Sequence, residues 1–265
     1  MTENAFGIDI SAYQYVEGKL VDFDRMRAQD PRPAHGPVRA DPAWTQLAGV
    51  KFVACRAGIS WGYTDQWFAR NWSELRRLDL PRMAYHVLYF EEDAQKQVDH
   101  FLKLVAPQEG EKLVLDLELD HGLSKAKITS TTKKAIEAIT RSCGQTPLIY
   151  SRAGWVNEFL SVEELPQGVE WWLAQYYRAK EYPAFTAEYP SPPLLPKGVG
   201  TWRIHQTGEK GNGSAVGVGS YYVDTDRFNG DEDALVEWFG RKHVVRTLEE
   251  RVAALEERVE RLERN

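Results

Sequence analysis

The feature that most constrains the fold of this chain is its alternation of short apolar runs with longer stretches of helical period. Eight apolar runs have the length and composition of strands: Phe6–Ile10, Phe52–Arg56, Arg82–Phe90, Lys112–Leu117, Leu148–Tyr150, Trp171–Tyr176, Trp202–His205 and Tyr221–Val223. Between the first five, apolar residues recur near the i, i+3, i+4 spacing of helices in Asp65–Leu78, Asp93–Val105 and Ser130–Ser142. This alternation predicts βαβ units with parallel strands.

The later strands lie closer together in the sequence. Their connections, Tyr189–Gly200 and Gly208–Gly219, are rich in Pro and Gly, which predicts that the sheet finishes without full helices. Eight strands can close a barrel, and 265 residues that are 43% hydrophobic can bury one substantial core. We therefore expect residues 1–240 to form an α/β domain, an irregular TIM-like β/α barrel of eight strands and fewer than eight helices.

A proline-rich segment interrupts the pattern before the second strand. Residues 24–44 contain Pro31, Pro33, Pro37 and Pro42 among charged and small residues. Proline removes a backbone donor and fixes its own φ, so the segment is incompatible with a regular helix or a central strand. It is predicted to be an inserted surface loop.

The C-terminal residues 241–265 follow a heptad pattern. Its a and d positions are Val245, Leu248, Val252, Leu255, Val259 and Leu262, and Glu and Arg flank them at e and g. An isolated helix of this length with one apolar stripe is marginal in water, so the stripe needs a partner. We expect a coiled-coil helix that joins copies of the chain into a homo-oligomer through residues 245–262, as a dimer or a trimer. The alternative is a helix folded back on its own barrel.

Charge and special segments exclude several classes of protein. The net charge of −6 argues against nucleic acid as a partner. Neither a leader sequence nor a run of about 18 apolar residues is present, so we expect no signal peptide and no membrane insertion. Cys55 and Cys143 form no disulfide framework and are expected to be two free, buried thiols.

Carboxylates stand at the ends of three predicted strands. Asp116 and Glu118 alternate at the end of one apolar run, so their side chains should share a face with α-carbons roughly 6–7 Å apart. Asp9 ends the first run and Asp224 follows the last. The C-terminal ends of barrel strands are where such folds assemble active sites. Any single acid there could equally be a loop residue or a helix cap, but a same-face pair is harder to explain in that way.

Crowded carboxylates repel one another, and one of them must keep its proton near neutral pH. Glycoside hydrolysis uses this difference: one carboxylic acid donates a proton to the leaving oxygen, while ionised neighbours stabilise the positive charge on the sugar. The acids at positions 9, 116, 118 and 224 therefore favour sugar chemistry.

The order of the motifs resembles glycoside hydrolase family 25, the lysozymes of phage endolysins and bacterial autolysins. The resemblance covers about residues 5–235 and rests on Gly7-Ile8-Asp9-Ile10-Ser11 with Gln14, Phe52-Val53 before Arg56-Ala57-Gly58, Tyr85-His86, Leu115-Asp116-Leu117-Glu118, Pro147-Leu148-Ile149-Tyr150, Trp172-Leu173-Ala174-Gln175-Tyr176, Trp202-x-Ile204-His205-Gln206, and Val223-Asp224-x-x-x-Phe228-Asn229-Gly230. Each motif alone is weak, whereas eight in the right order are specific.

This resemblance implies a flattened eight-stranded barrel that hydrolyses the β-1,4 bond from N-acetylmuramic acid to N-acetylglucosamine in bacterial peptidoglycan. It implies that Glu118 is the general acid, with Asp9, Asp116 and Asp224 as its acidic companions. Four further residues, Tyr85, Tyr150, Tyr176 and Gln206, match positions expected to contact substrate, although each could instead be a packed core residue. No metal and no cofactor is implied.

The chain departs from the commonest family pattern at Arg56-Ala57-Gly58-Ile59, where a Lys-x-Thr-like step is frequently followed by an acid. This difference concerns subsite preference rather than the chemistry. Without a leader, we expect a phage endolysin that is made in the bacterial host cytoplasm and reaches the cell wall after holin-type release or virion delivery.

Two other classes of function remain open. A non-catalytic module that binds cell-wall glycan would keep the aromatic residues but would not need a proton donor. A divalent-metal hydrolase would use the clustered acids as ligands, yet the six His are scattered and follow no common zinc spacing.

Overall fold

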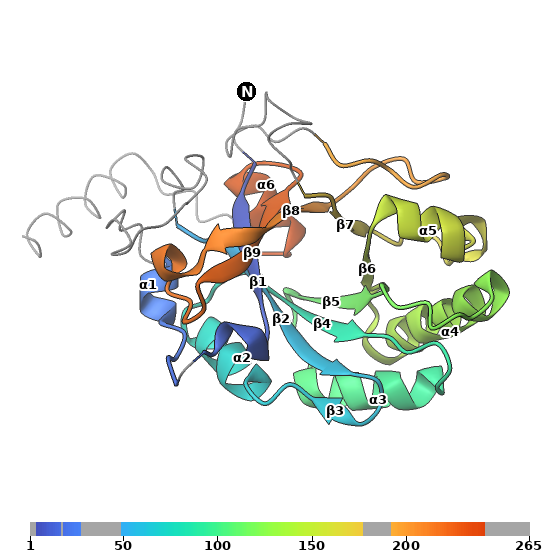
Figure 1. Ribbon diagram of the computed structural model, residues 1–265, viewed down its shortest axis with the longest axis horizontal. Helices are drawn as coiled ribbons and strands as arrows, with labels where there is room; N and C mark the ends of the chain where they lie inside the picture. The colour runs from blue at the N-terminus through green and yellow to red at the C-terminus, as the bar shows by residue number, and fades with distance from the viewer. Residues whose placement is uncertain (1–3, 17, 28–48, 177–191, 242–265) are drawn as a thin grey trace, which may run out of the picture.

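Eight strands close into a barrel, seen from the side in Figure 1. In this computed structural model, which describes residues 4–16, 18–27, 49–176 and 192–241, the ring consists of β1 (Phe6–Ile10), β2 (Phe52–Ile59), β4 (Arg82–Val87), β5 (Glu111–Asp116), β6 (Leu148–Ser151), β7 (Trp171–Ala174), β8 (Ile204–Asn212) and β9 (Tyr222–Phe228). Strand β1 pairs with both β2 and β9 and thereby closes the ring, while β3 (Tyr63–Thr64) is an antiparallel appendage of β2. The predicted eight-stranded barrel is confirmed.

All neighbouring strands from β1 round to β8 run parallel, and β9 is antiparallel to both of its neighbours. The predicted connection Gly208–Gly219 is wrong in its first part, because β8 continues to Asn212 and pairs with β9 there. Gly211 lies within this ladder and allows β8 and β9 to approach closely, since a Cβ at this position would lie 2.4 Å from the Thr225 side chain. Only the 3-10 helix η4 (Gly213–Val216) and the residues after it form the turn.

Six α-helices occur in the described part of the chain, so the prediction of fewer than eight is met there. They are α1 (Phe23–Arg27), α2 (Phe68–Arg77), α3 (Ala94–Val105), α4 (Lys125–Cys143), α5 (Ala153–Phe159) and α6 (Glu232–Trp238), with short 3-10 helices η1 (Ala12–Gln14) and η3 (Val162–Glu164). Helix α4 begins five residues before its predicted start because the Ser124 side chain accepts a hydrogen bond from the Lys127 amide and caps it.

The proline-rich segment was predicted to contain no regular helix, and for residues 24–27 this is wrong. These residues belong to α1, where the Asp22 side chain accepts a hydrogen bond from the Arg25 amide. The prolines themselves, and residues 28–44 as a whole, lie outside the described residues. So do residues 242–265, and the coiled coil therefore stays a prediction.

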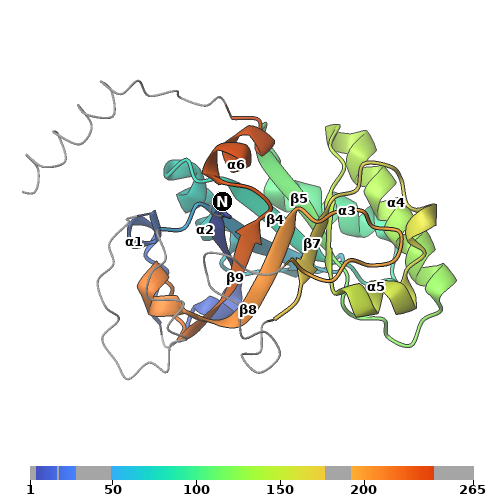
Figure 2. The same cartoon turned by 90° about the horizontal axis from the view of Figure 1, so that it is seen from above.

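Two apolar layers hold the barrel together. One fills the barrel and includes Val114, Trp172 and Ile204. The other lies between the strands and the surrounding helices α2 to α5 (Figures 1 and 2). Helix α6 closes one end of the barrel, because Leu235 and the following Phe239 join the inner layer. The alternation of inward and outward side chains is what places polar groups at the other end of the same inner wall.

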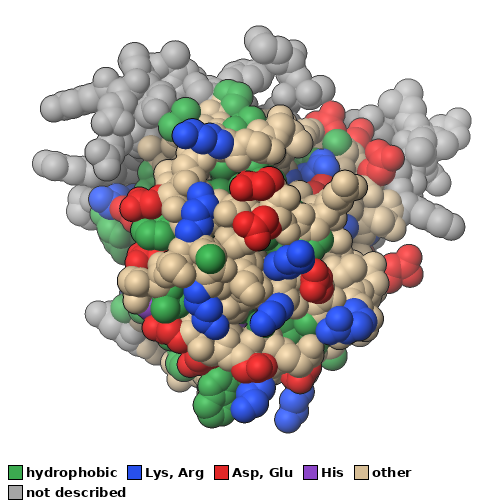
Figure 3. Space-filling view, turned by 90° about the vertical axis from the view of Figure 1, so that its right-hand side faces the viewer, with side chains coloured by type: hydrophobic (Ala, Val, Ile, Leu, Met, Phe, Trp, Pro, Cys, Tyr) green, Lys and Arg blue, Asp and Glu red, His purple; other side chains and the backbone are tan. Residues whose placement is uncertain are grey.

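The surface of the described residues is charged on the face that carries α4 and α5 (Figure 3). Across the face that carries α4 and α5, acidic and basic side chains are interspersed (Figure 3). None of the described helices combines the length and the apolar character that a membrane span requires. Cys55 and Cys143 are free thiols as predicted, although Cys143 is only half-buried.

Candidate active site

The first two acids are brought together by the sheet register. Asp9 on β1 and Asp224 on β9 are directly paired across the antiparallel ladder. Side chains of directly paired residues lie on the same face of the sheet. Asp9 is buried and Asp224 is partly buried, so the pairing sets two carboxyl groups side by side inside the barrel wall.

The second pair stands where β5 ends. Asp116 is the last residue of β5, and the intervening Leu117 is fully buried in the outer layer. The Leu117 amide donates to the Tyr150 carbonyl at 3.0 Å and its carbonyl accepts from the Ser151 hydroxyl at 2.6 Å, which holds the chain extended beyond the strand. Asp116 and Glu118 therefore share the inner face, as their spacing predicts.

The four acids are close enough to influence one another's protonation. Burial, then the charges of Asp224, Asp226 and Asp116, raise the pKa of Asp9 well above its usual value, against a hydrogen bond from Gln206. Burial, then Glu209 and Glu118, raise the pKa of Asp224 to about 7. All four residues that the sequence singled out thus converge at one end of the barrel.

The Asp116 and Glu118 carboxyls form a coupled pair. Burial, then Glu118, raise the pKa of Asp116 well above its usual value, and the positive charge of Arg56 opposes this. Burial raises the pKa of Glu118, whereas Arg152 and contact with Asp116 lower it. Because two close carboxylates cannot both ionise cheaply, the pair keeps a proton to higher pH than an isolated carboxyl would.

Gln206 on β8 connects the predicted substrate residues to Asp9. Its side-chain nitrogen donates to Asp9 Oδ2 at 2.6 Å. Its side-chain oxygen accepts from the hydroxyl of Tyr150 at 2.7 Å and from that of Tyr176 at 3.0 Å. Tyr150 and Gln206 are buried and Tyr176 is 37% exposed. The polar atoms of Gln206 are therefore committed within the protein, and Tyr176 is the member of this network with an open surface.

Tyr85 on β4 lies on the same inner wall. Its ring packs edge-on against Trp172, with centroids 6.2 Å apart, and Tyr150 packs edge-on against the same indole, with centroids 4.7 Å apart. The charges of Asp9, Asp116 and Asp224 all influence the pKa of Tyr85, which burial raises well above its usual value. Tyr85 is thus placed among the acids rather than in a separate core.

Asp226 is a site residue that was not selected from the sequence. It follows Asp224 by two positions on β9, so both point into the barrel. Asp226 is fully buried, its Oδ1 accepts from Trp172 Nε1 at 2.8 Å, and its Oδ2 has no hydrogen-bond partner in the described chain. The same alternation that singled out the pair in β5 is present in Asp224-Thr225-Asp226 and could have identified it.

Arg56 and Asp65 form a second unpredicted feature. Arg56 lies on the inner face of β2 beside Tyr85 in the ladder, and its Nε donates to Asp65 Oδ2 at 3.0 Å. Asp65 also accepts from the backbone amides of Ala12 at 2.8 Å and Trp67 at 3.0 Å. The chain segments that follow β1 and β2 are tied together by this one buried carboxylate.

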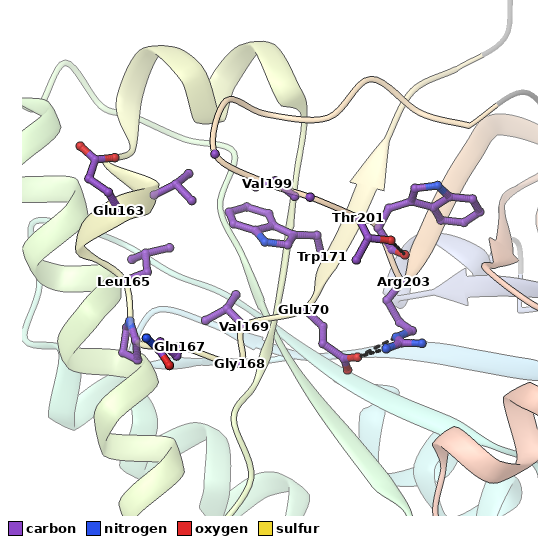
Figure 4. A pocket seen from close by; sticks show the side chains of 15 residues that line it. Glu163, Leu165, Gln167, Gly168, Val169, Glu170, Trp171, Val199, Thr201 and Arg203 are labelled. Atoms are coloured by element: carbon purple, nitrogen blue, oxygen red, sulfur yellow. Dashed lines mark hydrogen bonds and ion pairs between the residues drawn. The ribbon is translucent and has the colours of Figure 1, made fainter.

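Within the described ranges, no group of three or more His, Cys, Asp or Glu side chains is arranged to hold a metal ion. A separate hollow of about 380 Å³ lies between η3, the start of β7 and residues 198–203, where Glu170 and Arg203 form an ion pair (Figure 4). Because Glu170 precedes β7 and Arg203 precedes β8, this hollow is at the opposite end of the barrel from the acids.

Comparison with solved structures identifies the same fold in several proteins. The chain is similar to a family 25 glycosyl hydrolase from Bacillus anthracis, with a TM-score of 0.67 and 17% identity over 90% of this chain and 94% of the other. It is similar to a bacterial lysozyme from Streptomyces coelicolor, with a TM-score of 0.65 and 20% identity over 89% and 97%. A third is the catalytic domain of an endolysin from a Listeria monocytogenes bacteriophage, with a TM-score of 0.62 and 15% identity over 89% and 98%.

No curated protein sequence shows significant similarity to the chain. The model of the glycosyl hydrolases family 25, in contrast, matches residues 8–216, which run from within β1 to the end of η4. The match spans the barrel from Asp9 to the β8–β9 hairpin and contains three of the four predicted acids. The chain therefore belongs to family 25 of the glycosyl hydrolases.

Proposed function

We propose that this glycoside hydrolase is a peptidoglycan muramidase that hydrolyses the β-1,4 bond between N-acetylmuramic acid and N-acetylglucosamine. The observation that carries the proposal is the convergence of Asp9, Asp116, Glu118 and Asp224 at the end of one barrel. Such a cluster supplies both things that glycoside cleavage needs, a carboxyl that is still protonated near neutral pH and ionised neighbours.

In this proposal Glu118 donates the proton to the leaving glycosidic oxygen. It is less buried than Asp116, and it lies beyond the strand end, where a polymer has access. The ionised members among Asp9, Asp116 and Asp224 stabilise the positive charge that develops on the sugar ring. Tyr85 and Tyr176 contact substrate directly, whereas Tyr150 and Gln206 act through their hydrogen bonds by holding Asp9 in place.

We further propose that the protein serves as a phage endolysin. The similarity of its fold to an endolysin catalytic domain supports this role. The enzyme would be made in the host cytoplasm and would reach the wall after holin-type release or delivery with a virion.

The test is the release of reducing ends from purified peptidoglycan by the wild type and by Glu118→Gln. This nearly isosteric change removes the donor proton, and general acid catalysis contributes about 10² to 10⁴-fold, so kcat should fall by that factor. Glu158→Gln on α5 is the matched control, because Glu158 is exposed. It should retain wild-type kcat.

The same assay separates the competing functions. A non-catalytic glycan-binding module would bind the wall but release no reducing ends in the wild type. A metal hydrolase would lose its activity in EDTA, whereas the proposed muramidase keeps it. Full activity of Glu118→Gln would instead show that another of the clustered acids is the proton donor.

A further inference from the structure

Arg56 is a buried cation beside the acids of the site. It lies on the inner face of β2 and is paired with Tyr85 across the ladder to β4. Its charge lowers the pKa of Asp116, so it lies within electrostatic reach of the proposed catalytic pair. Proton donation needs a carboxyl whose pKa is raised, and a nearby cation lowers that pKa. Its presence in the site requires a separate explanation.

The way Arg56 binds Asp65 leaves both of its terminal nitrogens without a partner in the described chain. Only Nε donates to the Asp65 carboxylate, and neither terminal nitrogen makes a hydrogen bond within the described chain or is fully enclosed. Arg76 shows the contrasting arrangement, because it gives both Nε and Nη2 to Glu111, at 2.7 and 2.9 Å. Arg82 also donates only Nε to a carboxylate, but its Nη1 donates to the carbonyl oxygens of Leu75 and Leu80. Arg56 differs from both arginines because its terminal nitrogens have no hydrogen-bond partner among the described residues.

Asp65 and two tyrosines hold the guanidinium in a fixed position. Asp65 is fully buried and is itself anchored by two backbone amides, so it cannot follow a moving side chain. The guanidinium carbon lies 5.1 Å from the ring centroid of Tyr13 and 5.9 Å from that of Tyr63. Tyr13 is 76% exposed and Tyr63 is 45% exposed, so both present open aromatic surface beside the charge.

A planar guanidinium held in this way is suited to a carboxylate, which it can bind through two parallel hydrogen bonds. The neighbouring acids repel any anion, so an anionic ligand would bind here only if such a cation offset them. Peptidoglycan carries carboxylates beside its glycan, either on the stem peptide or, where no stem peptide is attached, on the lactyl arm of muramic acid. Other β-1,4-linked N-acetylglucosamine polymers carry none.

We infer that Arg56, between Tyr13 and Tyr63, recognises a carboxylate on the muramic acid side of the substrate and thereby selects acidic over neutral glycan. This inference rests on the proposed muramidase function. It assigns to Arg56 the selection of substrate, whereas the four acids carry the chemistry.

The experiment compares chemically matched glycan strands. One sample is stripped of stem peptides by an amidase, which leaves free lactyl carboxylates, and half of it is converted to neutral methylamides. Intact strands with stem peptides, with and without the same conversion, form the second pair. The wild type should favour carboxylate over methylamide strands about tenfold in kcat/KM, the factor expected of one charge-assisted hydrogen-bonded pair. The pair of samples that shows the preference identifies the lactyl arm or the stem peptide as the source.

In Arg56→Gln the ratio of kcat/KM for carboxylate over methylamide strands should fall to about one, and the loss should appear in KM rather than in kcat. Arg56→Lys should keep part of the preference. Arg152→Gln is the matched control, because Arg152 is a cation near Glu118 outside the Tyr13–Tyr63 pair. It should affect carboxylate and methylamide strands equally. A preference below twofold in the wild type for both pairs of strands would overturn the inference, and so would loss of preference in Arg152→Gln alone.

Two further measurements keep the outcomes distinct. If Arg56→Gln fails to fold because Asp65 loses its partner, the wild type still tests the inference. Its preference for carboxylate strands should weaken as the salt concentration rises. Calorimetric binding of the same strands to Glu118→Gln tests Arg56 even if the wild type cleaves nothing, which separates failure of this inference from failure of the proposed function. An equal loss on every strand, with a shifted pH profile, would show that Arg56 acts only through Asp116.

Discussion

Asp9 and Asp224 lie directly opposite one another in the antiparallel ladder between β1 and β9. The two residues are far apart in the sequence, and β9 is the one strand of the ring that runs against both of its neighbours. This reversal brings an acid of the last strand against an acid of the first. The pairing depends on backbone hydrogen bonds and not on loop conformation, so the two carboxyls stay close whatever binds above them.

The burial of Asp224 in this pairing, with the charges of Glu209 and Glu118 nearby, predicts how stability depends on pH. The pKa of Asp224 is about 7 in the folded protein, against about 3.9 for an unfolded aspartate, so the folded state binds the extra proton. Its contribution to stability is therefore complete below about pH 4 and is lost as pH rises through about 7. At pH 8, Asp224→Asn should exceed the wild type in unfolding free energy by at least about 1 kcal/mol. At pH 4 the two should be nearly equal.

Urea denaturation at pH 4, 6 and 8 measures this difference. Asp99→Asn, at an exposed position on α3, serves as the control and should parallel the wild type. If the difference in unfolding free energy between Asp224→Asn and the wild type is the same at all three pH values, the pKa of Asp224 is not raised in the folded protein.

The pH profile of activity should respond to Arg152, the N-cap residue of α5. Its positive charge lowers the pKa of Glu118, and its removal should let that pKa rise. Since the proposed general acid works only while protonated, Arg152→Gln should move the alkaline limb of kcat/KM to higher pH. Lys197→Gln, on the opposite end of the barrel, should leave the limb where it is. An unmoved limb in Arg152→Gln would argue against Glu118 as the titrating acid.

Glu111, at the start of β5, is predicted to stabilise the fold without taking part in catalysis. Its fully buried carboxylate accepts from Arg76 at 2.7 Å, from Arg82 at 2.8 Å and from the Gln108 amide at 2.9 Å. Glu111→Gln removes the charge that two arginines share and should cost about 3–5 kcal/mol in unfolding free energy. Glu74→Gln, at a partly exposed position where it breaks only a surface pair with Arg77, should cost less than about 1 kcal/mol.

Chemical denaturation measures both variants, and the pH optimum of activity should be unchanged in each. A loss below about 1 kcal/mol in Glu111→Gln would mean that the arginines find other partners or water.

Self-association through residues 245–262 remains a prediction from the heptad alone. Analytical ultracentrifugation should give a dimer or trimer mass for the full chain and a monomer mass for a chain ending at Gly240. Helix α6 is retained in the shorter chain, so the barrel end stays closed. Equal monomer masses for both would favour a helix folded on its own barrel.

Local patterns determined much of this protein. The eight strands, the helices at Asp65–Leu78 and Asp93–Val105, and the same-face pair of Asp116 and Glu118 follow from periodicities of two and 3.6 residues, which are properties of neighbouring residues. The glycines of Gly208–Gly219 led to the prediction of a connection, but the first of them lie in the closely paired strands of the β8–β9 hairpin. Short-range patterns cannot distinguish a glycine that turns the chain from one that admits a neighbouring strand.

Only the tertiary structure decided which polar groups bind one another and which stay open to a ligand. Gln206 holds Asp9 rather than facing solvent, one oxygen of Asp226 has no hydrogen-bond partner among the described residues, and the terminal nitrogens of Arg56 make no hydrogen bond there. These are results of barrel closure, register and packing between distant segments. Sequence alone determined which residues point inward along each strand, because alternation is local. Which inward residues meet depends on how the ring closes, and that is set by the packing of the whole chain.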